Sequence, residues 1–437
     1  MFAHLKSFFC CTNSFPSDYQ VATISTSHSV QSSDSLVLPL SQMKEHTKNQ
    51  LESKKEILYY SSLSPDISSI YLNDIIKVQS PDLIITKTVF GLNHILLLLQ
   101  DNTRTYLAGF GSNENGQLGL PVYSKNRSNI DIINSPSLNT YNTVILIDIF
   151  GNGDNIIDIA AANNFSLVLI ENALSHKKTL YRFELSQEEL FNIDNITGTK
   201  IHSIKIEPCP ETIVQNISRI YAKNERIILQ VDIDNSVYIK GMTFHLDINL
   251  KYKLFKSFKN KISNISIGIN HCLIHFANNT LISFGHNEYG ELGVLCNNPK
   301  EINELTFFKG HIIKKVCSGY RHSLVLCEDG VLYAFGDNNS KQCLGEAEYY
   351  QEPKVINLLN VVDIECGGKF SLIKNVYGEV YVWGECSFLF KDDVCVSQRG
   401  SSGMEGGVKL INDIKLKSIA GFFAGNEEVV FFAEKFN

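Results

Sequence analysis

Residues Val316 to Gly345 read VCSGYRHSLVLCEDGVLYAFGDNNSKQCLG, and this stretch decides the fold because its pattern returns elsewhere in the chain. It runs from a turn of small residues through a strand, a tight turn and a second strand to a corner rich in glycine and asparagine. Ile267 to Gly293 (IGINHCLIHFANNTLISFGHNEYGELG) and Ile364 to Phe390 (IECGGKFSLIKNVYGEVYVWGECSFLF) repeat the pattern. Internal repeats of about this period are typical of propellers and other repeat arrays.

The spacing inside the repeat predicts a β-hairpin. His271 to Gly285, His322 to Gly336 and Phe370 to Gly384 are each 14 residues apart, which fits two short strands around a tight turn. The residues on both sides alternate and favour β-structure, and Asp329-Gly330 is a strong hairpin turn signal. The unit is therefore predicted to be β throughout.

Seven copies can be aligned on the first residue of their second strand. Phe90 to Gly119 is a further clear copy, and weaker ones begin near Ile157, Ile217 and Ile419. The aligned positions are His94, Phe165, Arg226, His271, His322, Phe370 and Glu428. One small sheet cannot bury both of its faces, but stacked neighbours can. The sequence thus predicts an all-β fold, a seven-bladed β-propeller.

The two ends of the chain suggest how the ring closes. The seventh copy ends near Glu434 after only two strands, while Glu56 to Ser62 (EILYYSS) resembles the third strand of a repeat. We expect this N-terminal segment to supply the missing outer strands, which removes an open sheet edge. Residues 1–55 are predicted to be a disordered lead rich in Ser and Thr, and residues 56–437 the propeller.

These motifs resemble the RCC1 (regulator of chromosome condensation) repeat family. The matching elements are G-x-x-H-S-L, the Asp-Gly turn, the aromatic strand end before glycine, and N-x-x-G-Q/E-L-G at Asn113 to Gly119 and Asn287 to Gly293. The resemblance covers residues 56–437 and is strong in the first copy and in copies four to six. It implies a seven-bladed propeller, in a family that includes exchange factors for a small GTPase and many non-catalytic interaction proteins.

Composition narrows the classes of partner. The formal net charge of −7 argues against general nucleic-acid affinity, and no apolar run approaches the ~20 residues of a membrane helix. The 11 cysteines include no C-x-x-C pair, which suits reduced thiols in the cytoplasm and/or the nucleus. Lipid attachment at Cys10 or Cys11 is a minor alternative to an unmodified end.

Residues that could carry chemistry are few. His94, His271 and His322 share one repeat position, so they belong to different blades; a structural hydrogen bond in each blade's own turn is the favoured interpretation, and contact with a partner the alternative. No metal site is expected because ligands must converge on one ion, and no cofactor is expected because the glycine phrases do not open a helix. The predicted structural repeat glycines are Gly111, Gly119, Gly285, Gly293, Gly319, Gly336, Gly345 and Gly384.

One insertion is a candidate binding loop. Leu120 to Asn142 lengthens the gap between the first two copies and has little periodicity, so we expect a long loop on one face of the ring. Binding residues concentrate on such loops, and Tyr123, Lys125 and Arg127 are the candidates within it. A tolerated insertion without function is an equal alternative.

Two hypotheses for function follow. The first is a non-enzymatic interaction propeller, an adaptor or regulatory subunit that holds a protein partner and is itself monomeric. The second is a guanine-nucleotide exchange factor for a Ran-like small GTPase, which the resemblance implies. The repeated histidine position would then face the GTPase, but Phe165, Arg226, Phe370 and Glu428 occupy it in the other copies, which favours the first hypothesis.

Overall fold

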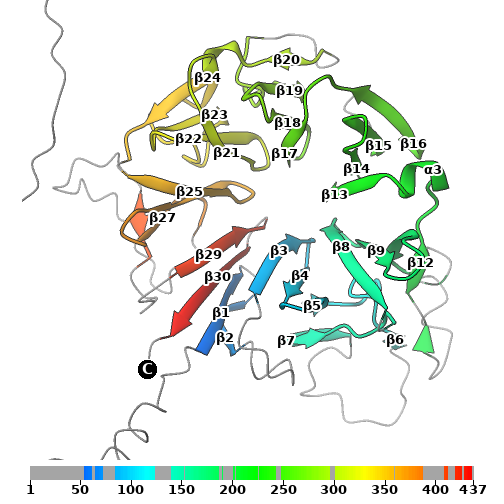
Figure 1. The fold of residues 1–437 in the computed structure, drawn as a ribbon. Coiled ribbons are helices and arrows are strands. Elements are labelled where there is room, and N and C mark those ends of the chain that lie inside the picture. Colours follow the sequence, from blue (N-terminus) through cyan, green and yellow to red (C-terminus); the bar gives the residue numbers. More distant parts are fainter. Residues whose placement is uncertain are drawn as a thin grey trace, which may run out of the picture. The chain divides into compact units, whose positions relative to one another are not determined.

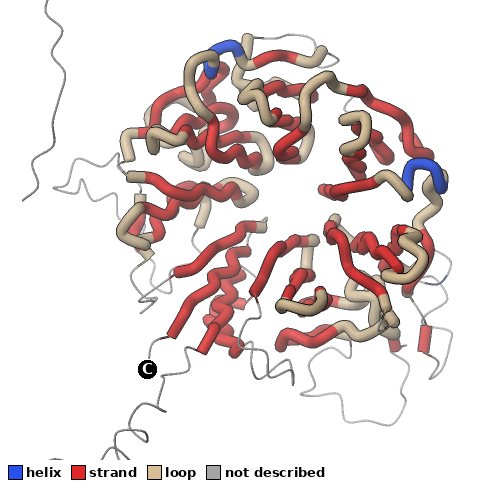
Figure 2. Tube along the Cα trace, in the orientation of Figure 1, coloured by secondary structure: helices blue, strands red, loops and turns tan. Residues whose placement is uncertain are grey.

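A computed structural model of the chain describes residues 54–61, 64–71, 84–123, 139–151, 153–186, 189, 200–201, 203–224, 226–242, 248–295, 301–358, 360–386, 408–411, 419–425 and 428–435. All of them belong to one compact unit, Glu52–Asn437. The predicted disordered lead falls almost wholly on residues 1–53, outside the described part. Strands make up most of the described residues, as the tube in Figure 2 shows.

Six four-stranded antiparallel sheets, here called blades, are each formed by one continuous stretch of chain, and Figure 1 shows them side by side around a centre. The first three contain β3 (Ile84–Phe90), β4 (His94–Gln100), β5 (Thr105–Ser112) and β7 (Thr140–Leu146); β8 (Asp154–Ala161), β9 (Ser166–Asn172), β10 (Lys178–Phe183) and β12 (Ile204–Ile206); and β13 (Ile217–Lys223), β14 (Arg226–Val231), β15 (Ser236–Met242) and β16 (Ile248–Ser257). A short helix, α3 (Glu211–Val214), joins the second blade to the third.

The next three blades repeat this plan. They contain β17 (Ile262–Ile267), β18 (His271–Phe276), β19 (Leu281–Gly285) and β20 (Asn303–Glu304); β21 (Ile313–Ser318), β22 (His322–Cys327), β23 (Leu332–Asp337) and β24 (Tyr349–Ile356); and β25 (Val361–Cys366), β26 (Phe370–Asn375), β27 (Val380–Gly384) and β28 (Lys409–Leu410). A 3₁₀ turn, η1 (Thr306–Phe308), lies between β20 and β21.

The predicted repeat alignment matches the strands. In six copies the second strand begins at the aligned residue, and β9 begins one residue later, at Ser166. Antiparallel pairing sets His271 opposite Gly285, His322 opposite Gly336 and Phe370 opposite Gly384. The constant 14-residue spacing is therefore the length of a hairpin whose two ends face each other.

A further sheet joins the two ends of the unit. β1 (Lys54–Ser61) pairs with β30 (Glu428–Lys435), β2 (Ser64–Tyr71) pairs with β1, and β29 (Ile419–Ala424) completes the order β2-β1-β30-β29. This is the pairing expected for Glu56 to Ser62. The predicted all-β propeller is confirmed, but only six blades are continuous, so a count of seven is reached only if this composite sheet is included.

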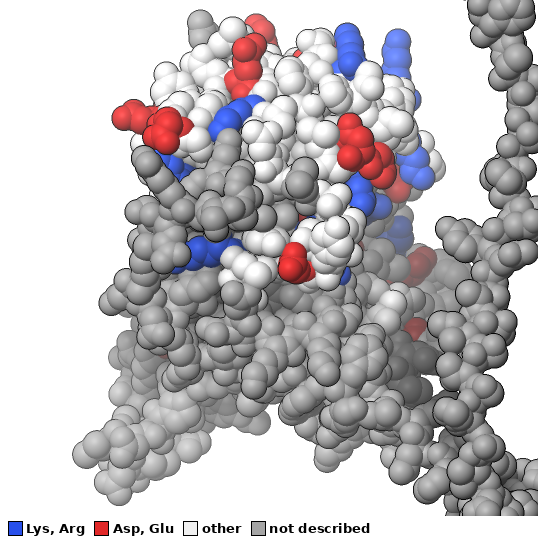
Figure 3. Space-filling model, turned by 90° about the vertical axis from the view of Figure 1, so that its left-hand side faces the viewer, with Lys and Arg blue, Asp and Glu red and all other residues white. Residues whose placement is uncertain are grey.

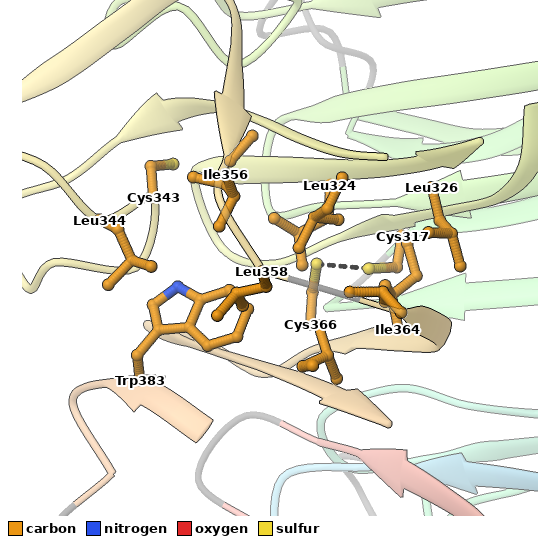
Figure 4. Packing of buried hydrophobic residues seen from close by; sticks show 14 residues of the cluster. Cys317, Leu324, Leu326, Cys343, Leu344, Ile356, Leu358, Ile364, Cys366 and Trp383 are labelled. Carbon is orange, nitrogen blue, oxygen red and sulfur yellow. Dashed lines mark hydrogen bonds between the residues drawn. The ribbon is translucent and has the colours of Figure 1, made fainter. Parts of the chain in front are cut away.

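The core lies between neighbouring blades, because each sheet packs its apolar face on the next. One cluster fills the space between the β21–β24 and β25–β28 blades, and Figure 4 shows its closely packed side chains. Trp383 is fully buried there, and its indole Nε1 donates a hydrogen bond of 2.9 Å to the carbonyl of Gln342. The burial of both faces explains why the second strands are apolar along nearly their whole length.

The insertion from Leu120 to Asn142 departs from the expected loop. Its end belongs to β7, the outer strand of the first blade, and near its start β6 (Val122–Tyr123) pairs with β11 (Lys200–Ile201). The chain has a second insertion between β10 and β12 of the second blade, and β11 lies in it, so the two insertions are joined by strand pairing. The residues between, 124–138, lie outside the described part.

Candidate interaction surface

The three repeated histidines are buried between blades rather than exposed. His94 is 1% exposed, and His271 and His322 are 0% exposed. Each stands at the start of the second strand of its blade. This burial corrects the expectation that their rings contact a partner, since no partner can reach them in this arrangement.

Each ring is hydrogen-bonded to a serine of the following blade. His94 Nε2 lies 2.7 Å from Ser166 Oγ, and His271 Nε2 lies 2.9 Å from Ser323 Oγ. The corresponding distance from His322 Nε2 to Ser371 Oγ is 3.1 Å. The expected hydrogen bond within each blade's own turn is therefore wrong: the histidines join neighbouring blades.

The serines in two of these pairs also fix the protonation of the rings. Ser323 Oγ donates to the carbonyl of Glu291, and Ser371 Oγ donates to that of Gln342. Since a hydroxyl has one proton, each serine must accept from histidine, which makes Nε2 the protonated ring nitrogen. Both acceptor carbonyls lie in the blade that carries the histidine, so each serine makes two hydrogen bonds to the preceding blade.

The sequence itself records this link. Histidine occurs at the aligned position only where the next copy has serine one residue further on, as in His94–Ser166, His271–Ser323 and His322–Ser371. The other copies lack both partners. The residues at the two corresponding positions are Phe165 and Ile227, Arg226 and Cys272, Phe370 and Val429, and, where the last copy is compared with the first, Glu428 and Ile95. Serines 166, 323 and 371 were missed from the sequence, although this correlation between successive copies could have found them.

Where the link is missing, other contacts hold the residue at the aligned position. Within the second blade, the guanidinium of Arg182 on β10 lies 3.6 Å from the centre of the Phe165 ring. Arg226 donates a 2.8 Å hydrogen bond to Asn270 Oδ1 in the next blade. Phe165 and Arg226, two of the residues that interrupt the histidine pattern, thus each have a specific contact in the structure.

The predicted repeat glycines fall into three structural groups. At the end of the third strand, and again at the following corner, they have positive φ, a region that other residues rarely adopt. The first group is Gly111, Gly285, Gly336 and Gly384, and the second is Gly119, Gly293 and Gly345. Gly319 differs: a Cβ there would lie 2.1 Å from His322 Cε1, so the buried ring requires glycine three residues before it.

The asparagine of each corner motif holds the corner closed. Asn113 Nδ2 donates to the carbonyl of Leu120, and Asn113 Oδ1 accepts from the backbone N–H of Leu118. Asn287 makes the equivalent pair of bonds with Val294 and Leu292. The N-x-x-G-Q/E-L-G motif therefore closes the corner in the two blades that carry it.

The turns between the first and second strands of the six continuous blades lie at one end of the strands and are here called the loop face. It comprises Leu92–Asn93, Asn163–Asn164, Asn224, Ile269–Asn270, Tyr320–Arg321 and Gly368–Lys369. Backbone N–H groups connect the turns of successive blades: Leu92 to Asn163, Asn163 to Asn224, Ile269 to Tyr320, and Tyr320 to Gly368. These bonds across blades make the loop face a rigid platform.

Side chains of mixed charge stand on the loop face. The exposed Arg321 guanidinium lies 4.8 Å from the centre of the Tyr289 ring, and Lys369 Nζ lies 3.0 Å from Glu385 Oε2. Mixed charge is also seen from the side that carries β25 and β27, where Figure 3 shows basic and acidic side chains interspersed among uncharged ones. The described part of that side lacks the basic stripe that binds a phosphate backbone.

The candidates in the insertion are only partly placed. Tyr123 ends β6, while Lys125 and Arg127 lie outside the described residues. Among the described residues, no group of three His, Cys, Asp or Glu side chains could hold a metal ion. No helix in the described part is long and apolar enough to cross a membrane.

Blades of four antiparallel strands, joined by recurring histidines and shaped by corner asparagines, define a repeat-built β-propeller. The family model for the regulator of chromosome condensation (RCC1) repeat matches residues 313–342, which include His322 and the serine that follows it, Ser323. This segment of the chain thus matches the RCC1 repeat. The resemblance noted in the sequence is thus confirmed.

Known proteins with similar sequences match parts of the chain. Human HERC2, an E3 ubiquitin-protein ligase, is 33% identical over 146 residues, covering 31% of this chain and 3% of HERC2. The RCC2 homolog of Xenopus laevis is 33% identical over 122 residues, covering 26% of this chain and 23% of that protein. The chain therefore matches less than a quarter of the length of either relative.

A solved structure shows the same fold over most of the chain. Prp20p from Saccharomyces cerevisiae, described with its binding to Gsp1p and histones, superposes with a TM-score of 0.63 at 18% sequence identity. The superposition covers 88% of this chain and 92% of that one. At this identity the likeness concerns the fold alone.

The buried histidines predict acid sensitivity. Burial lowers the pKa of His94 and of His271 to about 3, while an unfolded chain titrates near 6.5. Between these values the unfolded state binds protons that the folded state does not, so stability is full above pH 6.5 and falls as the pH is lowered. At pH 5 each ring should have lost about 2 kcal/mol of unfolding free energy.

Urea unfolding of His271→Ala tests this expectation. The variant should be less stable than wild type at pH 7.5, and the difference should shrink by about 2 kcal/mol at pH 5. His176→Ala is the matched control, because its ring is 79% exposed. A His271→Ala deficit that is the same at both pH values would contradict the assignment of a neutral buried ring.

Proposed function

We propose that the protein is a non-enzymatic interaction propeller, an adaptor or regulatory subunit that binds a protein partner through its loop face. The observation that carries the proposal is the set of backbone hydrogen bonds joining the turns of successive blades. They hold exposed side chains from several blades, such as Arg321 and Lys369, in fixed relative positions. A pre-organised surface loses little conformational entropy when a partner binds.

The composite sheet supports this role if it acts as the seventh blade. Phe90 packs against Gly425, where an added Cβ would lie 2.7 Å from its ring, so the sheet of β29 and β30 touches the first blade. A ring closed in this way keeps the platform rigid. We infer a monomeric ring located in the cytoplasm and/or the nucleus, consistent with the free thiols of its described cysteines.

The alternative is guanine-nucleotide exchange on a small GTPase. It is favoured by the likeness to Prp20p, which is described as binding Gsp1p. An exchange factor can speed nucleotide release only by stabilising the nucleotide-free GTPase relative to the loaded one. We expect micromolar protein to accelerate release of a fluorescent guanine nucleotide from a Ran-like GTPase by no more than about threefold. A larger acceleration would establish the alternative.

The interaction itself is tested by affinity capture with quantitative mass spectrometry. The double variant Arg321→Glu/Lys369→Glu should lose at least one protein that wild type retains. Lys259→Glu/Lys261→Glu is the matched control, because these exposed lysines follow β16, at the opposite end of the strands. Identical captured proteins for wild type and both variants would contradict binding through the loop face.

A further inference from the structure

Two buried sulfur atoms lie unusually close together between neighbouring blades. Cys317 Sγ, on β21, is 2.6 Å from Cys366 Sγ, on β25, and Figure 4 shows the two side chains pointing at each other. This separation is only about 0.5 Å longer than a disulfide bond. All of the described cysteines, these two included, are free thiols.

The surrounding structure holds the two strands in position. Lys315 Nζ, two residues before Cys317, lies 2.8 Å from Asp363 and 2.7 Å from Glu365, next to Cys366. A second link, from His322 to Ser371, joins the same two blades just beyond the sulfur atoms. The thiols are therefore brought together by contacts that do not depend on a bond between them.

The two thiols are also electronically unequal. Burial raises the pKa of Cys317 well above its usual value. For Cys366 burial acts in the same direction, but interactions with the Cys317 thiol and the His322 ring outweigh it and bring its pKa to about 7. A thiolate is the reactive form of cysteine, so Cys366 is the sulfur expected to react first.

We propose that Cys317 and Cys366 are a redox-sensitive pair that forms a reversible disulfide between the β21–β24 and β25–β28 blades when a small peroxide is the oxidant. The Cys366 thiolate attacks one oxygen of hydrogen peroxide and becomes a sulfenic acid, and the departing hydroxide takes up a proton to form water. Cys317 sulfur then attacks the Cys366 sulfur, and the hydroxyl group leaves as a second water with the thiol proton. In sum, two thiols and one peroxide give one disulfide and two waters.

The disulfide would tie the blades together without requiring them to move far. It would close a loop of about 50 residues in the unfolded chain, which should raise the melting temperature by roughly 5 °C. A thiol reductant should reverse the change. Oxidation would thus stiffen the ring at one blade junction.

Peptide mapping of the full chain tests the proposal. The native protein is treated with a small excess of hydrogen peroxide, then unfolded in the presence of N-ethylmaleimide so that its remaining buried thiols are blocked, and digested with trypsin. We expect a disulfide between the tryptic peptides 316–321 and 355–369, at about tenfold the level of any disulfide-linked peptide pair that contains Cys327. The absence of this pair, or preferential linkage of Cys366 to Cys343, would overturn the proposal.

Melting curves provide a second readout. Wild type should melt at a higher temperature after peroxide than after reductant, whereas Cys317→Ser and Cys366→Ser should not respond. Cys327→Ser is the control, because Cys327 is also buried but lies on β22 and is not one of the two paired cysteines, so this variant should respond as wild type does. If either serine variant fails to fold, the difference between oxidised and reduced wild type decides, and an unchanged melting temperature would refute a bond across the blades.

Discussion

Replacing Gly336 with alanine is expected to lower the unfolding free energy by about 3 kcal/mol or more. The residue has a φ of +106°, and an added Cβ would lie 2.4 Å from the carbonyl oxygen of Arg321. That oxygen belongs to backbone, so it cannot rotate away as a flexible side chain would. The strand end and the turn beside it would both have to shift.

Gly153→Ala is the matched control for this variant. Gly153 is exposed, and a Cβ there would meet nothing within 4 Å. Its substitution should change stability by less than about 0.5 kcal/mol. Urea unfolding of both variants at the same pH measures the difference, and equal midpoints would mean that the strain at Gly336 is not real.

Removing residues 1–72 should lower the melting temperature by roughly 10 °C or more, or yield aggregated protein. The deletion takes away β1 and β2 and leaves the whole edge of β30 unpaired. An open strand edge is a template for pairing with other chains. Removing residues 1–50 ends before β1 and should leave the melting temperature nearly unchanged.

A peptide of residues 54–71 gives this experiment a sharper form. If β1 completes the composite sheet, the peptide should add to the edge of β30 and raise the melting temperature of the shorter chain. A peptide of the same composition in scrambled order is the control. Equal melting of the two truncated proteins, with no effect of the peptide, would contradict closure by the N-terminal strands.

Much of the fold could be predicted because the spacing within each repeat shows how its second and third strands pair. The spacing between His322 and Gly336 is fixed by the hairpin, so the same spacing is found in copies that have other side chains at these positions. The pairing of Glu56 to Ser62 with the last copy was also predictable, since a two-stranded unit at one end of the chain required strands from elsewhere. Both predictions depend on backbone geometry, which short sequence patterns record well.

The environment of the histidines could not be predicted in the same way. A repeat alignment compares the same position in different copies, whereas the contact of His322 with Ser371 joins two different positions of successive copies. Burial between blades is likewise a property of two copies at once. The pairing of β6 with β11 was hidden for a related reason, because it joins two insertions that have no counterpart elsewhere in the chain.

The His–Ser link also limits how such a ring can grow by tandem duplication. A copied blade that carries one residue of the link must fit its own duplicate as well as its old neighbours, so it needs both histidine at the aligned position and serine immediately after. Only the copy with His322 and Ser323 carries both, whereas His271 is followed by cysteine and Phe370 precedes serine. That copy could be duplicated without leaving a buried histidine or serine unmatched, and both residues lie within residues 313–342, where the chain matches the RCC1 repeat. Among the copies that carry a residue of the link, the one that contains this match is thus the one whose sequence still permits its own repetition.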